Sequence, residues 1–130
     1  MILKLFILNF IFMEPNYKKL LVWQKAIQLV SKIYKLTQDF PKVEIYGLTS
    51  QMRRSAVSVP SNVAEGSQRN SNKSFIQFLN VSLGSLAELD TQMIIAQNLD
   101  LIKVDKDILK VVEEELIEVR KMLLGLRSSL

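Results

Sequence analysis

The sequence predicts an all-α fold, an antiparallel up-down-up-down four-helix bundle. Three observations support this prediction. Hydrophobic residues make up 48% of the 130-residue chain, which is enough to build a core. Only four Gly and three Pro are present, so few breaks are available between long helices. Apolar residues recur at helical spacing in four segments, which short polar stretches separate.

The first helical segment is expected at residues 17–38. The residues of its apolar seam lie alternately three and four positions apart, which is the 3.5-residue period of coiled coils. This seam consists of Leu20, Trp23, Ile27, Val30, Tyr34 and Thr37. Pro41 disfavours helical geometry at Phe40, so the segment is expected to end before this pair.

The second segment is expected at residues 44–64, with a kink at Pro60. Its core stripe consists of Ile45, Leu48, Met52, Ala56, Val59 and Val63. Pro60 removes the amide that would bond to the carbonyl of Ala56, at a cost of about 3 kcal/mol where nothing compensates. The hydroxyls of Ser58 or Ser61 are candidates to satisfy the freed groups. Gly66 is expected to end the helix as a left-handed C-terminal cap.

The third and fourth segments are expected at residues 74–98 and 105–126. Phe75, Leu79, Leu86, Leu89 and Met93 form the core face of the third, with Ser71 or Asn72 as its N-cap. Leu109, Val112, Leu116, Val119, Leu123 and Leu126 form that of the fourth. The glutamates at residues 113–115 are interpreted as a solvated outer face.

The bundle is expected to be one domain, residues 13–130, behind an apolar extension at residues 1–12. "MILKLFILNFIF" is too short to span a bilayer, which takes about 20 residues, and no small-residue cleavage site follows it. "MEPNYKKL" has the character of a fresh start at Met13, so the extension is interpreted as a mis-called start or a dispensable segment. A targeting or packing segment is the alternative, and no membrane association is expected.

Basic residues gather in the first part of the chain. Residues 1–80 hold 11 Lys and Arg against 4 Asp and Glu, whereas residues 81–130 hold 6 against 9. This asymmetry favours polyanion binding or complementary subunits, and two solvated faces are the simpler alternative. The candidate basic face for RNA or DNA consists of Lys18, Lys25, Lys32, Lys35, Arg53, Arg54, Arg69 and Lys73. Phosphate contacts would make its binding sensitive to salt and tolerant of sequence.

The chain contains no Cys and no His. It therefore has no thiolate or imidazole for catalysis, no usual zinc site and no Glu-x-x-His for a di-iron centre. No glycine-rich phosphate loop is present either. Glu65 and Glu88 are the carboxylates considered for acid/base chemistry, and both are interpreted as structural or interface groups. The sequence predicts a non-enzymatic protein with no catalytic residue, cofactor or metal.

Three stretches, spanning about residues 17–102, resemble one known family. They are "LLVWQKAIQLVSKIYKLTQDFP", "EIYGLTSQMRRSAVSVPSNVAEGSQRNS" and "FIQFLNVSLGSLAELDTQM". They resemble the bacterial four-helix-bundle protein family, also called the 23S rRNA intervening-sequence protein family. The family signature falls on Ser58, Pro60, Asn62, Glu65 and Gly66. The fourth segment matches by pattern only, and Ser74 stands where many relatives have an acid.

The resemblance implies a cytoplasmic bundle that assembles as a ring-like homopentamer. It also implies kinship with the accessory protein of diversity-generating retroelements, which works with a reverse transcriptase and nucleic acid. The expected partners are therefore the chain itself, RNA or DNA, and a reverse transcriptase. We expect a non-enzymatic homo-oligomer that binds RNA or DNA as an accessory protein. The alternative is a protein–protein scaffold that binds no nucleic acid.

A narrow polar stripe adjoins the core stripe of the second segment and has two candidate roles in such an oligomer. It either forms a network inside one subunit or faces a neighbouring subunit, and we favour the subunit interface. Arg54 and Glu65 are about 16 Å apart on one helix, so each needs a partner elsewhere. The residues assigned to the interface or network are Gln51, Arg54, Ser58, Pro60, Asn62, Glu65 and Gly66.

Overall fold

The computed structural model describes residues 1–5 and 16–130, and all of its regular elements in these residues are helical. A single helical turn at residues 2–5 precedes the rest. The other elements are η1 (Asn16–Lys19), α2 (Leu21–Thr37), η2 (Lys42–Glu44), α3 (Leu48–Ser67), α4 (Asn72–Asn98) and α5 (Lys106–Ser129). The predicted all-α class is confirmed. The predicted domain boundary between residues 12 and 13 lies outside the described residues.

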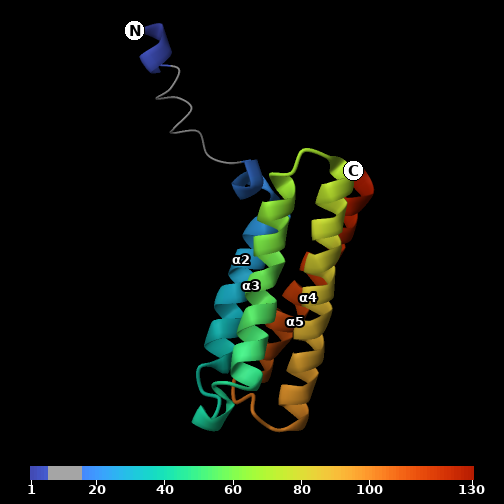
Figure 1. Ribbon diagram of the computed structural model, residues 1–130. Helices are drawn as coiled ribbons and strands as arrows, with labels where there is room; N and C mark the ends of the chain where they lie inside the picture. The colour runs from blue at the N-terminus through green and yellow to red at the C-terminus, as the bar shows by residue number, and fades with distance from the viewer. Residues whose placement is uncertain (6–15) are drawn as a thin grey trace.

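The four long helices lie side by side around one core (Figure 1). Helix α2 packs against α3 and α5, and α4 packs against the same two helices. No contact joins α2 to α4, or α3 to α5, in the described chain. The core residues with the largest fully buried side chains include Leu29, Ile33, Met52, Leu79, Leu89, Met93 and Leu123. None of the described helices has the length and apolar character needed to cross a membrane.

The most extensive contact joins α3 and α4. Ser82 on α4 is fully buried, and its hydroxyl donates a 2.8 Å hydrogen bond to the carbonyl of Val59. Further along, the hydroxyls of Ser58 and Ser85 are hydrogen-bonded at 2.7 Å. Residue numbers fall along α3 as they rise along α4 in these pairs. Small side chains let the two helices approach closely, and their hydroxyls are satisfied across the contact.

Gly66 lies inside α3, so its predicted role as a left-handed cap is wrong. The helix ends at Ser67, Gln68 follows in a right-handed conformation, and no glycine of the described residues has a positive φ. The reason for glycine is instead steric. A Cβ at Gly66 would lie 2.6 Å from the Cβ of Phe78 and 3.4 Å from the carbonyl oxygen of Phe75, both on α4.

Pro60 is buried within α3, and the helix extends on both sides of it. The suggested use of the Ser58 hydroxyl to satisfy groups freed by the proline is not what the contacts show. That hydroxyl bonds to Ser85 on α4 and accepts from the side-chain amide of Asn62. Because α4 packs closely against α3, the Ser58 hydroxyl bonds to a side chain of α4 in addition to Asn62 of its own helix. The kink itself stays a prediction.

The predicted seam of α2 is rotated relative to its core stripe. The residues that α2 buries are Val22, Ala26, Leu29, Ile33, Leu36 and Thr37, of which only Thr37 was in the predicted seam. Ile27 and Tyr34, which the seam placed in the core, are 40% and 44% exposed. Both stripes follow the same 3.5-residue rhythm, and the contacts with α3 and α5 select between them.

The other three core faces largely match the prediction. Helix α3 begins at Leu48 instead of residue 44, because the preceding residues form η2, and Ile45 is consequently half exposed. The predicted core residues of α4 are all buried, and Ser71 caps this helix by accepting from the amide of Ser74. In α5 the predicted stripe is buried in the middle and partly buried at Leu109 and Leu126.

Acidic side chains of α5 face basic side chains of α2. Lys25 Nζ lies 3.3 Å from Glu118 Oε2, and Lys32 forms a second ion pair with Glu115. Glu115 is only 8% exposed, so its predicted place on a solvated outer face is wrong. Packing of α5 on α2 buries this carboxylate, and the lysine supplies the charge that a buried carboxylate requires.

The close approach at Gly66 predicts a loss of stability on substitution. Gly66→Ala places a methyl group against the Cβ of Phe78, and we expect overpacking to lower the free energy of unfolding by about 1–3 kcal/mol. Gly84→Ala is the matched control, because a Cβ there meets nothing within 4 Å. It should raise the free energy of unfolding by roughly 0.5–1 kcal/mol. Urea denaturation measures both, and an unchanged or more stable Gly66→Ala protein would contradict the steric account.

The two ion pairs predict unequal effects of removing each lysine. Lys32→Ala leaves the buried Glu115 without its partner, and we expect a loss of about 2 kcal/mol in the free energy of unfolding. Lys25→Ala removes a pair whose carboxylate is 48% exposed, and the expected loss is less than about 1 kcal/mol. Thermal and urea unfolding measure both variants. Equal losses in the free energy of unfolding would contradict the account, because they would show that burial of Glu115 does not strengthen its dependence on Lys32.

Candidate nucleic-acid interface

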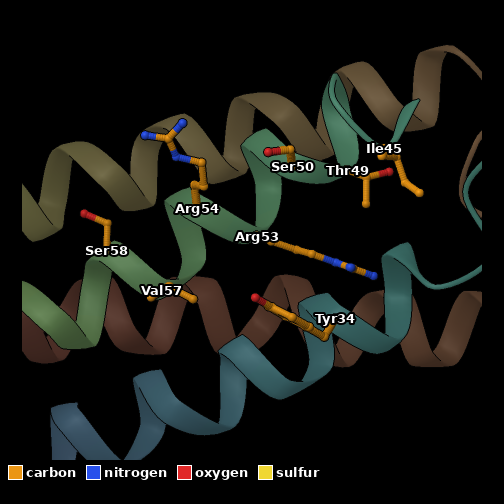
Figure 2. A pocket seen from close by; sticks show the side chains of 8 residues that line it. All are labelled: Tyr34, Ile45, Thr49, Ser50, Arg53, Arg54, Val57 and Ser58. Atoms are coloured by element: carbon orange, nitrogen blue, oxygen red, sulfur yellow. The ribbon is translucent and has the colours of Figure 1, made fainter. Parts of the chain in front are cut away.

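A depression between α2 and α3 brings two of the predicted basic residues together. It encloses about 540 Å³ and opens to solvent. Its lining contains two arginines, four hydroxyl-bearing side chains, one of which is a tyrosine, and no carboxylate. The lining residues are Tyr34, Ile45, Thr49, Ser50, Arg53, Arg54, Val57 and Ser58 (Figure 2). Arginine and hydroxyl side chains are the groups with which proteins contact phosphate oxygens.

Arg53 is held in place by two residues of α2. Its guanidinium carbon lies 4.6 Å from the centre of the Tyr34 ring. Its Nε donates a 2.9 Å hydrogen bond to Oγ1 of Thr37, whose own hydroxyl donates to the carbonyl of Ile33 at 2.8 Å. The cation–π contact and this hydrogen bond restrict the side chain, so less conformational entropy remains to be lost when it binds a ligand.

Arg54 points the other way from the same helix. Figure 2 shows Arg53 directed towards α2 and Arg54 directed towards α4. Arg54 is exposed and also lines a second groove of about 440 Å³ between α3 and α4. The remaining lining residues of that groove are Gln51, Ser55, Ser58, Ser85, Glu88 and Gln92. The two arginines therefore serve adjoining surfaces and do not form one bidentate clamp.

The other predicted basic residues are spread along the bundle. Lys18, Lys35 and Lys73 are exposed. Lys25 and Lys32 lie on the side of α2 that faces α5, where both form ion pairs. The predicted basic face is thus not one continuous stripe, because α5 neutralises its middle.

Arg69 pairs with Glu65 at 3.0 Å and stacks on the ring of Phe78 at 4.7 Å. Glu65 therefore has the partner that it was expected to need. This partner is four residues further along the chain, at the end of α3, and the ion pair is exposed.

The predicted polar stripe of α3 divides in two. Asn62 donates from its side-chain amide to the carbonyl of Ser58 at 2.8 Å and to its hydroxyl at 3.0 Å, which links both residues to Ser85 on α4. Gln51, Arg54 and Glu65 are exposed along the same edge. Within one subunit, the structure therefore brings Ser58 and Asn62 into a network and leaves the ends of the stripe open.

Tyr34 and Thr37 are the site residues that sequence reasoning missed. Both were assigned to the apolar seam, yet they lie on α2 and contact Arg53 on α3. Their signal in the sequence was a hydroxyl at each of two seam positions, which an apolar core would not require. Among the described residues, no group of three or more carboxylates is placed to hold a metal ion.

Comparisons with known proteins agree with the helical architecture. The family model described as "23S rRNA-intervening sequence protein" matches residues 18–125. A crystal structure of a protein of unknown function from the S23 ribosomal protein family of Bacteroides thetaiotaomicron is similar, with a TM-score of 0.72 and 19% sequence identity. The likeness covers 82% of this chain and 98% of that one. A comparison with curated proteins finds no match. The chain belongs to the 23S rRNA-intervening sequence protein family.

Proposed function

We propose that this chain is a non-enzymatic, cytoplasmic, homo-oligomeric bundle that binds RNA or DNA through the α2–α3 depression. The observation that carries the proposal is the lining of that depression, which has two arginines, four hydroxyl-bearing side chains and no carboxylate. The phosphates of a nucleic acid would therefore meet no negatively charged side chain in this lining. Membership of the family supports a role beside rRNA processing. A role in retroelement processing rests on the resemblance noted from the sequence.

The chemistry of the depression favours contact with backbone phosphates over base-specific recognition. Arg53 is pre-positioned by Tyr34 and Thr37, and Ser50 lies in the same lining, whereas the Ser58 hydroxyl is bonded to Ser85 and Asn62. Tyr34 is 44% exposed, and the ring face away from Arg53 is proposed to stack on an unpaired base. Such stacking tolerates any base, so the proposed binding is tolerant of sequence.

The proposed assembly is an antiparallel up-down-up-down bundle, bent at Pro60 and repeated in a ring of five copies. The opposed numbering of the α3–α4 pairs, such as Ser82 with Val59 and Ser58 with Ser85, supports the antiparallel order. The resemblance noted from the sequence supports the pentamer. A ring would repeat the depression around its surface and multiply the number of phosphate contacts for one nucleic-acid strand.

A protein–protein scaffold is the second candidate function. Two observations favour it: the ion pairs of Lys25 and Lys32 with α5, and the exposure of Ile27 on the outer face of α2. In this alternative the bundle presents apolar surface to proteins and holds no nucleic acid. A reverse transcriptase is the partner that the family resemblance proposes, and co-purification with a tagged copy of the chain would test it.

The proposed interface predicts a specific change in salt dependence. We expect the unmodified protein to bind single-stranded RNA of arbitrary sequence with an affinity that falls steeply with salt. Arg53→Gln with Arg54→Gln removes two cations of the depression. The variant should bind more weakly, and the slope of log affinity against log salt should shrink in magnitude by about 1.4, or 0.7 for each lost contact.

Lys110→Gln with Lys121→Gln is the matched control, since it removes two exposed cations from α5, outside the depression. Its affinity and slope should stay close to those of the unmodified protein. Loss of binding in the control as large as in the arginine variant would show that only net charge matters. No binding at low salt by the unmodified protein would favour the scaffold function.

A further inference from the structure

A small apolar groove runs between α2 and α3, nearer the N-terminal end of α2 than the depression described above. It encloses about 290 Å³, and its lining includes Trp23, Ile27, Val30, Val57 and Pro60. Ile27 and Val57 are each 40% exposed. This groove exists because α2 turns its second apolar stripe outwards, and no part of the described chain covers it.

A second apolar groove lies between α4 and α5. These helices make the least extensive contact of the four neighbouring pairs, and the space between them encloses about 430 Å³. Leu83, Ile94 and Ile117 are among its lining residues. Ile94 is 51% exposed and Ile117 is 56% exposed, so water covers both side chains in a single copy. Exposed apolar surface of this kind marks an interaction site.

The two grooves lie on opposite sides of the bundle. Each helix contacts only its two neighbours, in the closed order α2, α3, α4, α5 and back to α2. The α2–α3 pair and the α4–α5 pair are therefore opposite edges of this arrangement (Figure 1). One chain cannot place its own first groove against its own second groove. Two copies can do so, and the pair then retains one free groove of each kind, one on each copy.

The charges around the grooves are complementary. The lining of the α2–α3 groove contains no charged residue, and the exposed Lys18 and Lys19 of η1 adjoin Tyr17, which also lines this groove. The α4–α5 groove includes Asp90 and Glu113 in its lining, with Arg120 as its one cation. Two copies of the α2–α3 surface would instead bring Lys18 and Lys19 of both copies to one contact, a repulsion that disfavours a self-symmetric contact.

We infer that the α2–α3 groove of one copy packs against the α4–α5 groove of the next copy. The occupant of each groove is therefore a second copy of this chain, in a head-to-tail contact. This inference rests on the proposed homo-oligomer and names its two surfaces. A head-to-tail contact joins different surfaces, so it closes into a ring when the rotation between copies permits. The depression that contains Arg53 lies further along the α2–α3 side and adjoins the contact at Val57, which lines both.

Single cysteines test this pairing, because the chain has no cysteine of its own. Ile27→Cys marks the α2–α3 groove, and Ile117→Cys marks the α4–α5 groove. The two variants, with different affinity tags, are refolded together and treated with a short bismaleimide. We expect a cross-linked product of two chains that carries both tags, and no such product from either variant alone. Gly84→Cys with Ile27→Cys is the control pair and should give none, since Gly84 faces open space on α4.

Three results would overturn the inference. Cross-linked pairs in either single variant would show a self-symmetric contact. An absence of mixed pairs, while sedimentation still shows a multiple of the chain mass, would show that the copies meet through other surfaces. A mass of one chain for the unmodified protein would remove the proposed homo-oligomer together with its interface. Circular dichroism of each variant confirms that the helical fold is retained before cross-linking.

Discussion

The close approach of α3 and α4 is the constraint on which the rest of the structure depends. It requires a residue without a side chain at Gly66, where α4 presses Phe78 against the helix, and a small buried hydroxyl at Ser82. In this orientation of α3, the side chains of its two consecutive arginines project towards different neighbouring helices. Arg53 reaches the end of α2 and Arg54 reaches towards α4 (Figure 2). Helix packing thereby decides which cations share a surface.

Electrostatics divides the basic half of the chain into an internal and an external part. The acidic face of α5 takes Lys25 and Lys32 into ion pairs, and Glu115 is buried in the process. Part of the charge asymmetry of the sequence therefore stabilises the packing of α5 on α2 through these two ion pairs. The external part includes the α2–α3 depression, whose lining contains Arg53 and Arg54 and no carboxylate.

The number of helices and most of the core could be predicted because the apolar periodicity of α3, α4 and α5 allows one core face. Helix α2 carries two apolar stripes of the same period, one through Ile27 and one through Leu29, and no local property of the sequence tells them apart. Gly66 was misassigned because a glycine near a helix end usually serves as a cap. Its contact with Phe78, like the support that Tyr34 gives to Arg53, joins segments that only the packing brings together.

Native-state hydrogen exchange tests most directly whether the α3–α4 contact is the constraint that organises the bundle. Amides in the middle of α3 and α4, such as those of Val59 and Leu86, should exchange only through global unfolding and show the highest protection in the molecule. Amides of α5, such as that of Leu123, should open at a lower free energy, because its contacts with its neighbours are less extensive. Protection that is highest in α5 or α2, with α3 and α4 opening first, would contradict the account.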